Sequence, residues 1–319
     1  MADTLKIAVL DDYLEVAQGL ADWDRLEAEI TFFKDVIAPE DLAQRLADFD
    51  VVIAMRERSR FDAGLIAQLP NLKLLVSTGA RNAAIDMQAC EKAGIEVRFA
   101  AGSGLGNNGT AELAWALLMA LNKGLVSEVN NLRAGLWQTQ MPPVLAKKRL
   151  GIVGLGKQGQ KLARYGQAFE MDVVAWSPNL TDERAAAAGV TRVSKEELFS
   201  SSDFISVHLV LSETTQHVID AQALASMKPS AYLINTSRAG LIDTVALKAA
   251  LDEGRLAGAG LDVFDVEPLP VDDPWRQVPN ALLTPHIGYS NTENFAAYFP
   301  NAVETIADWQ ASLGSVSDA

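Results

Sequence analysis

Short apolar, β-branched runs alternate with longer segments of helical spacing along almost the whole chain. In the first third the apolar runs lie at 5–10, 50–55, 72–76 and 95–99, and segments such as APEDLAQRLADF separate them. Near-continuous apolar strands that alternate with helices are typical of βαβ units in a parallel sheet. The pattern therefore predicts an α/β domain in this part of the chain.

A second series of the same kind begins at residue 149. Its apolar runs are 149–156, 171–177, 204–210, 231–237, 258–264 and 281–286. We therefore expect an α/β fold with two doubly wound parallel-sheet domains. The Gly- and Asn-rich segment 99–109 is the natural first crossing between them. The last helical segment is expected to cross back and pack on the first domain. We therefore predict that residues 1–100 and 290–319 form one domain and that residues 101–289 form the other.

The segment TAELAWALLMAL at 110–121 is apolar around nearly its whole circumference. Such a helix is expected to be buried in a core or an interface, and Thr110 is a candidate for its N-cap. The arm that follows contains Trp137 in RAGLWQTQ.

Composition and charge exclude several classes of protein. The 319 residues are 49% hydrophobic and 21% charged, with a net charge of -14. This charge disfavours nucleic acid and anionic membrane surfaces as partners, and no apolar run is long enough to span a bilayer.

The single cysteine, Cys90, excludes an intramolecular disulfide and is expected to be a small buried hydrophobe. With no export pattern in MADTLKIAVLDD, we expect a cytoplasmic protein, and no metal site is predicted.

A glycine motif follows the first strand of the second series. Gly154, Gly156 and Gly159 form G-x-G-x-x-G between a strand and a helix. Glycine allows the tight turn, the close approach of a pyrophosphate to the backbone and close packing of helix on strand. The motif, including Lys157 and Gln158 at the helix start, therefore predicts a Rossmann-type dinucleotide site.

The end of the next strand indicates which nicotinamide cofactor is preferred. NAD-binding domains usually place an acidic residue there to accept from the ribose 2'-hydroxyl, but this chain has Ser177. Ser177, Asn179 and Thr181 could hydrogen-bond a 2'-phosphate, and Arg184 could reach it or be a solvated helix residue. The sequence thus admits NAD(P)H, with a slight preference for NADP.

Three polar residues follow successive strands of the second series. They are Arg238 in LINTSRAG, Glu267 in LDVFDVEPLP and His286 in TPHIG, separated by 29 and 19 residues. Taken singly, Arg238 could be a surface charge, Glu267 a loop residue that aids solubility, and His286 the cap of a turn. Together they suit a proton transfer beside an anion, because arginine grips a carboxylate and a carboxylate bonded to imidazole fixes its tautomer and favours its protonated form.

The order of G-x-G-x-x-G, NTSRAG, LDVFDVEPLP and TPHIG resembles the D-isomer-specific 2-hydroxyacid dehydrogenases, a family that includes D-3-phosphoglycerate dehydrogenase and glyoxylate/hydroxypyruvate reductase. The resemblance runs over nearly the whole chain and is strongest over 149–290. It implies a Rossmann-type nucleotide-binding domain and a flavodoxin-like substrate domain. It also implies that His286 is the acid/base, that Glu267 is its partner and that Arg238 holds the substrate carboxylate.

The same resemblance implies further contacts to the cofactor. Asp262 in GLDVF matches the position that bonds the nicotinamide carboxamide, and Thr236 and Gly288 match backbone contacts. The acid missing at 177 is one departure from the family pattern.

In the first domain, LKLLVSTGARNAAID is similar to the family's substrate loop. The resemblance implies that the amides around Ser77, Thr78 and Gly79 receive the carboxylate, and that Arg56 presents a second arginine to a substrate anion. Arg81 departs from the small residue that is common in the phosphoglycerate branch, so the anion contacts of this loop stay open.

The expected function is hydride transfer between a nicotinamide cofactor and a small 2-oxo acid or D-2-hydroxy acid, in a cleft between two domains of a homodimer. Two alternatives share the scaffold. A formate dehydrogenase needs no general base and replaces the glutamate by a neutral amide, which Glu267 argues against. A nucleotide-sensing corepressor is expected to carry extended tails, so we favour the enzyme.

Overall fold

The computed structural model describes residues 4–316 of the chain, with side chains described to residue 313. The chain divides into two compact units: Met1–Asn107 with Asn291–Ala319, here the first unit, and Asn108–Ser290, the second unit. The boundaries predicted from the sequence lay at residues 100/101 and 289/290, and the units divide at 107/108 and 290/291.

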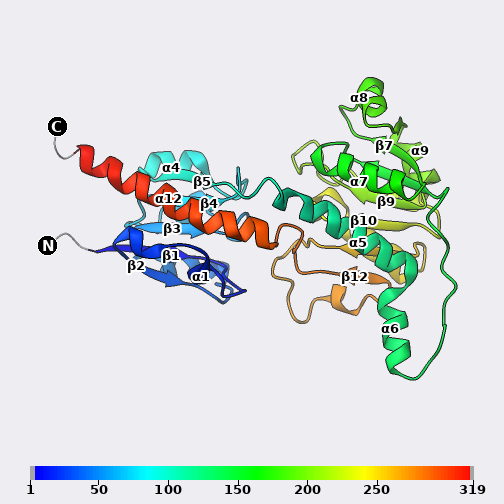
Figure 1. The fold of residues 1–319 in the computed structure, drawn as a ribbon, viewed down its shortest axis with the longest axis horizontal. Helices are drawn as coiled ribbons and strands as arrows, with labels where there is room; N and C mark the ends of the chain where they lie inside the picture. The colour runs from blue at the N-terminus through cyan, green and yellow to red at the C-terminus, as the bar shows by residue number, and fades with distance from the viewer. Residues whose placement is uncertain (1–3, 317–319) are drawn as a thin grey trace. The chain divides into compact units, whose positions relative to one another are not determined.

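The first unit has a five-stranded parallel sheet in the order β2-β1-β3-β4-β5 (Figure 1). This is the flavodoxin-like order. The strands are β1 Leu5–Val9, β2 Ala28–Phe32, β3 Val51–Ala54, β4 Leu74–Thr78 and β5 Glu96–Ala100. The edge strand β2 was not predicted, because its residues AEITF are mostly half-buried and form no continuous apolar run.

Short helices and one long helix accompany this sheet. They are α1 Ala17–Leu20, η1 Trp23–Leu26, η2 Pro39–Asp41, α2 Leu42–Leu46, α3 Ala63–Ile66, α4 Met87–Ala93 and α12 Thr292–Val316. Helix α12 packs on β4 and β5. Asn301 on this helix donates to the Ala101 carbonyl at 2.7 Å, and Gln310 donates to the Leu26 carbonyl at 2.8 Å. The end of the chain therefore belongs to the first unit. Cys90 on α4 is buried in the core, as expected.

The second unit has a seven-stranded parallel sheet in the order β12-β11-β10-β9-β6-β7-β8. Its strands are β6 Arg149–Val153, β7 Asp172–Trp176, β8 Thr191–Arg192, β9 Phe204–Val207, β10 Tyr232–Asn235, β11 Gly258–Leu261 and β12 Ala281–Leu283. The two-residue strand β8 was not predicted. The strand order reverses between β6 and β9, and open α/β sheets bind ligands at the carboxyl ends of the strands beside such a switch point.

Helices cover both faces of this sheet. The helices of this unit are α5 Gly109–Lys123, α6 Leu125–Arg133, α7 Lys157–Ala168, α8 Asp182–Ala187, α9 Lys195–Ser201, α10 Ala221–Ser226 and α11 Thr244–Asp252, with short turns η4 Ala239–Leu241 and η5 Pro274–Gln277; η3 Gly106–Asn108 spans the boundary between the units, and α6 extends from α5 without buried residues of its own. Alternate strand residues enter two separate cores: Leu150 and Ile152 lie in one, and Val153 lies in the other. Two buried faces explain why these strands are apolar without alternation.

Helix α5 corresponds to the predicted apolar segment, and it packs on α7, β10 and β11. The prediction that Thr110 is its N-cap is wrong. The helix begins at Gly109 with Asn108 at the cap position, and the Thr110 hydroxyl instead donates to the Gly288 carbonyl at 3.1 Å. A search of the described residues finds no helix of the length and apolarity that a membrane crossing requires.

Candidate active site

The glycine motif forms the turn between β6 and α7, and each glycine has a separate reason. Gly154 has φ +100°, and a Cβ there would lie 2.7 Å from the His208 carbonyl oxygen at the end of β9. A Cβ on Gly159 would lie under 3.0 Å from the Gly154 carbonyl oxygen, so α7 packs directly on the turn. Around Gly156 a Cβ would meet nothing within 4 Å, which leaves open space beside the backbone.

The start of α7 completes this turn. Gly156 occupies the cap position and no side chain caps the helix, whose first residues are Lys157 and Gln158. Exposed amides at a helix N-terminus favour an anion such as a pyrophosphate. The open space at Gly156 and the switch point between β6 and β9 therefore fit a dinucleotide.

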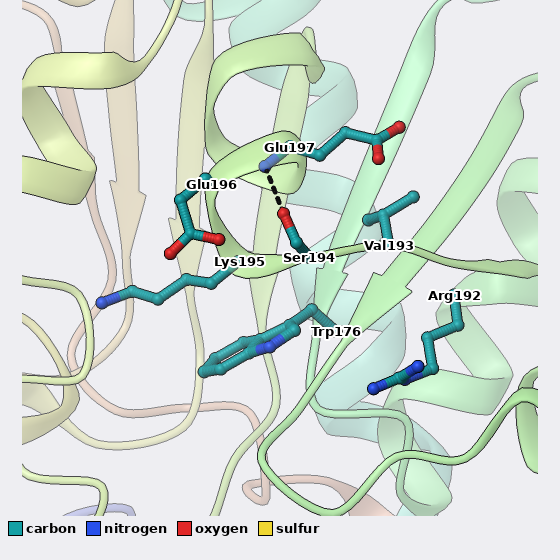
Figure 2. Close-up of a pocket in the computed structure, with 7 residues that line it drawn as sticks. All are labelled: Trp176, Arg192, Val193, Ser194, Lys195, Glu196 and Glu197. Carbon is teal, nitrogen blue, oxygen red and sulfur yellow. Dashed lines mark hydrogen bonds between the residues drawn. The ribbon is translucent and has the colours of Figure 1, made fainter.

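The carboxyl ends of β7 and β8 border an open pocket of about 540 Å³ (Figure 2). Figure 2 shows the indole of Trp176 with Lys195 on one side and Arg192 on the other. Both cations are paired with exposed carboxylates at 3.3 Å, Arg192 with Asp182 and Lys195 with Asp220. Such exposed pairs are weak, and a stronger anion can replace the carboxylate.

Trp176 lines this pocket, and Ser177 is the next residue along the chain. Arg184, one of the predicted contacts to a 2'-phosphate, lies in α8 and donates to the Asn179 carbonyl at 3.1 Å. Thr181 is the N-cap of α8 and accepts from the Arg184 amide. These residues hold their own loop together.

The strand order places the three predicted reacting residues after neighbouring strands. Arg238 follows β10, Glu267 follows β11 and His286 follows β12, and these strands are adjacent in the sheet. The imidazole Nδ1 of His286 lies 2.5 Å from Glu267 Oε2, and both side chains keep about a quarter of their surface accessible, 21% and 25%. Because Nδ1 faces the carboxylate, Nε2 is the ring atom that remains for proton exchange.

The environment of Glu267 keeps it ionised. Burial has the largest single influence and acts to raise the pKa of Glu267, but the hydrogen bond and charge of His286, the Phe264 amide and the charge of Arg238 outweigh it. The pKa of Glu267 therefore lies below its ordinary value. The second oxygen of the carboxylate accepts from the Phe264 amide at 2.8 Å, which fixes its orientation.

Asp262 binds the loop that carries His286. Its carboxylate accepts from the Thr284 hydroxyl at 2.6 Å and from the amides of Ile287 and Gly288 at 2.8 and 2.9 Å. Burial raises the pKa of Asp262, partly offset by these three donors. The Gly288 amide is taken by Asp262 and its carbonyl accepts from the Thr110 hydroxyl, so the second lone pair of this carbonyl and the Cα remain for the predicted cofactor contact. Thr284 was not singled out from the sequence, although a hydroxyl between a strand and a histidine was a usable signal.

Arg238 is held by a turn that the sequence did not reveal. The buried Asn235 donates to the Arg238 carbonyl at 2.9 Å and accepts from the Ser237 amide at 2.9 Å. The Arg238 guanidinium donates to the Ser237 carbonyl at 2.6 Å. In the same turn the Thr236 hydroxyl is buried and has no hydrogen-bond partner among residues 4–316. An unsatisfied buried hydroxyl at the carboxyl end of β10 is a fitting contact for a bound cofactor.

The other two histidines have different environments. His208 follows β9, its Nε2 lies 2.9 Å from the Ser206 hydroxyl, and burial lowers its pKa to about 4. It is therefore neutral at physiological pH. His217 is exposed, as expected for a surface residue.

In the first unit, the predicted substrate loop follows β4. Ser77 and Thr78 are fully buried strand residues. The Gly79 amide donates to the Ala100 carbonyl at 2.7 Å, so the expectation that this amide receives a carboxylate is corrected. The next two amides, of Ala80 and Arg81, bond to no other residue in the described part of the chain. These two exposed residues are the better candidates for carboxylate binding.

Comparison with known proteins gives the same picture as this geometry. A family model described as "D-isomer specific 2-hydroxyacid dehydrogenase, NAD binding domain" matches residues 115–288. The chain belongs to this D-2-hydroxyacid dehydrogenase family. It is 34% identical to a glyoxylate reductase of Korarchaeum cryptofilum over 83% of this chain and 81% of that protein. It is 36% identical to an (S)-sulfolactate dehydrogenase of Chromohalobacter salexigens, over 90% of this chain and 91% of that protein.

Among solved structures, a phosphoglycerate oxidoreductase from Vibrio cholerae O395 is similar over 97% of this chain and 100% of its own, with a TM-score of 0.90 and 35% identity. As a D-2-hydroxyacid dehydrogenase, the protein is an oxidoreductase that acts on CH–OH donors and uses a nicotinamide cofactor.

Proposed function

We propose that the enzyme reduces a small 2-oxo acid to the D-2-hydroxy acid, with His286 as the acid. The pairing of His286 Nδ1 with Glu267 at 2.5 Å carries this proposal, because it leaves Nε2 to deliver a proton while the carboxylate stabilises the imidazolium. The reduced nicotinamide, when bound, supplies the hydride. In the reverse direction neutral His286 acts as the base.

Arg238 is proposed to hold the substrate carboxylate and polarise the C2 oxygen. Its position after β10, beside the pair after β11 and β12, supports this role. Asp262 is proposed to hold the His286 loop in place and to accept from the nicotinamide carboxamide. Gly154, Gly156 and Gly159, with Lys157 and Gln158, are proposed to bind the pyrophosphate.

The test is a spectrophotometric panel that pairs NADH and NADPH with glyoxylate, hydroxypyruvate, longer 2-oxo acids and 3-phosphohydroxypyruvate. We expect oxidation of the cofactor with at least one of them, and His286→Ala should lose about 10²- to 10⁴-fold in turnover. His217→Ala is the matched control and should retain full activity. Retained activity of His286→Ala would refute its role, and a silent panel would favour a nucleotide-sensing protein.

We propose that NADPH is the preferred cofactor. Ser177 offers no carboxylate to a ribose 2'-hydroxyl, and Arg192 and Lys195 line the pocket at the carboxyl ends of β7 and β8. Loss of one guanidinium should weaken NADPH binding by about tenfold and leave NADH binding unchanged. We would titrate both cofactors by their fluorescence against Arg192→Gln, with Arg184→Gln as the control. Equal effects on NADH and NADPH would contradict the proposal.

We also propose that the enzyme is a homodimer and that it is located in the reducing cytoplasm. The segment 125–144 exposes several large apolar side chains, among them Leu132 at 59%, Trp137 at 78% and Met141 at 97%. Apolar surface of this extent is typical of a subunit interface. In analytical ultracentrifugation we expect a dimer, and a Trp137→Glu, Met141→Glu variant should be monomeric. A wild-type monomer at micromolar concentration would exclude this interface.

A further inference from the structure

The backbone of His286 has an uncommon conformation. Its φ is +51°, in the left-handed region that a residue with a side chain rarely adopts. Its amide donates to the Thr284 carbonyl at 3.0 Å, which closes a tight turn directly after β12. A strained residue of this kind keeps its conformation only where the surrounding structure holds it. The groups that hold this turn therefore decide where the imidazole lies.

Two groups from other parts of the second unit bind the residues that follow His286. The Asp262 carboxylate accepts from the amides of Ile287 and Gly288. The Thr110 hydroxyl, from a position 178 residues away in the chain, donates to the Gly288 carbonyl at 3.1 Å. Gly288 is thus bonded through its amide to one group and through its carbonyl to the other.

Both groups pack closely around Gly288. A Cβ on Gly288 would lie 3.1 Å from Asp262 Oδ2, and it would lie 3.4 Å from both Cα and Oγ1 of Thr110. Little space therefore remains for the turn to shift toward either group. The bond from Thr110 holds the Gly288 carbonyl against the start of α5.

Thr110 is a fixed point because α5 is anchored in the second unit. The helix packs on α7, β10 and β11. Its Leu117 side chain reaches Gly260 of β11, where a Cβ would lie 3.1 Å from Leu117 Cβ. Asp262 follows the same strand directly. Thr110 and Asp262 therefore belong to one packed body, and together they clamp the turn on which His286 lies.

The partner of His286 is fixed separately. Glu267 accepts from the Phe264 amide at 2.8 Å through one carboxylate oxygen and faces His286 Nδ1 at 2.5 Å with the other. A shift of the His286 turn would therefore change the geometry of the pair. Misplacement of a reacting group by about 1 Å can cost about 10²-fold in rate.

We propose that Thr110 is a positioning residue for the reaction: its hydroxyl holds the Gly288 carbonyl and thereby keeps the left-handed turn in the conformation that pairs His286 with Glu267. This inference rests on the proposed function, in which His286 is the acid. Because Thr110 acts through His286, loss of its hydroxyl lowers kcat. KM stays unchanged, because Arg238 holds the substrate carboxylate.

Three variants of Thr110 separate the hydroxyl from the rest of the side chain. Thr110→Val keeps the shape and removes the donor, and Thr110→Ala removes the donor and favours the helix. In both, we expect kcat for the best 2-oxo acid of the panel to fall about tenfold with KM unchanged, and the melting temperature to fall by no more than about 4 °C. Thr110→Ser keeps the hydroxyl and should retain the wild-type kcat.

Thr305→Val is the matched control. It removes another part-buried threonine hydroxyl that donates to a backbone carbonyl, that of Asn301 at 2.6 Å in α12. This variant should leave kcat unchanged.

A spectroscopic measurement follows the His286 pair without turnover. The chain has three histidines, so the imidazole NMR signals of protein labelled with ¹⁵N-histidine are few enough to resolve. The proton between His286 Nδ1 and Glu267 should give a signal far downfield that is absent from His286→Ala. This signal should weaken in Thr110→Val and Thr110→Ala and persist in Thr110→Ser and Thr305→Val.

The outcomes separate this inference from the proposed function. An unchanged kcat in the variants without the hydroxyl, or an equal fall of kcat in Thr110→Ser, would overturn the role of Thr110 and leave the proposed function intact. If no 2-oxo acid is turned over, the proposed function fails, and the NMR signal decides whether Thr110 holds the turn. A downfield signal as strong in Thr110→Val as in wild type refutes the inference.

Discussion

Two glycines of the nucleotide turn, Gly159 and Gly156, allow the effect of an added methyl group on stability to be separated from its effect on cofactor binding. Gly159→Ala would place a methyl group under 3.0 Å from the Gly154 carbonyl oxygen, which is backbone and cannot rotate away. Overpacking of this kind costs up to about 3 kcal/mol, and the better helix propensity of alanine returns about 1 kcal/mol. We therefore expect a net loss of about 2 kcal/mol, which lowers the melting temperature of a unit of this size by about 4–8 °C.

Gly156→Ala should behave in the opposite way. Its backbone, with φ -82° and ψ -160°, is open to alanine, and the methyl group meets nothing within 4 Å. Stability should therefore be unchanged. The added methyl group would stand where a pyrophosphate approaches the backbone, so the Kd for the cofactor should rise about tenfold or more.

Both variants are measured by thermal melting without cofactor and by fluorescence titration with NADH and NADPH. A Gly156→Ala protein that melts normally and binds both cofactors as tightly as wild type would place the pyrophosphate elsewhere and refute the reasoning. A Gly159→Ala protein that melts like wild type would show that α7 does not press on the turn.

Further predictions concern the reacting groups. Glu267→Gln replaces the carboxylate that faces His286 Nδ1 by a neutral amide and should lower kcat for the 2-oxo acid, as measured in steady-state kinetics; an unchanged kcat would contradict the role of the pair. The lowered pKa of Glu267 means that the pair stabilises the fold above about pH 4.5 and that this contribution is lost as the pH falls through the lowered value; acid unfolding of Glu267→Gln should therefore lack this component. Thr284→Val removes one of the three donors to Asp262 and should cost about 1–3 kcal/mol in chemical denaturation, with a parallel loss of kcat. Arg238→Lys replaces a planar fork by a point charge and should raise KM for the 2-oxo acid; an unchanged KM would place the substrate carboxylate elsewhere.

The residue types and their local spacing were sufficient to predict much of the second unit. Apolar runs marked its six longer strands, because strands buried on both faces need apolar side chains at every position. The glycines of the turn were assigned their roles because close backbone approach excludes a Cβ. Arg238, Glu267 and His286 could be singled out as candidates because parallel strands end at one edge of the sheet, which brings distant positions to one place.

The sequence was less informative where a partner decides the structure. The edge strand β2 has no two-sided burial, and β8 has two residues, so neither has a distinct apolar run. Thr110 has the chemistry of a cap, but the Gly288 carbonyl takes its hydroxyl.

The apolar periodicity and the order of the motifs were enough to predict two α/β units, a nucleotide turn and a histidine–glutamate pair, since these depend on spacing along one chain. Which amide is occupied and which arginine faces the substrate loop were decided only by the fold. Gly79 gives its amide to Ala100, and the Arg56 guanidinium lies against the Gly79 backbone. Such pairings depend on three-dimensional contact between segments whose own sequences carry no mark of their partners.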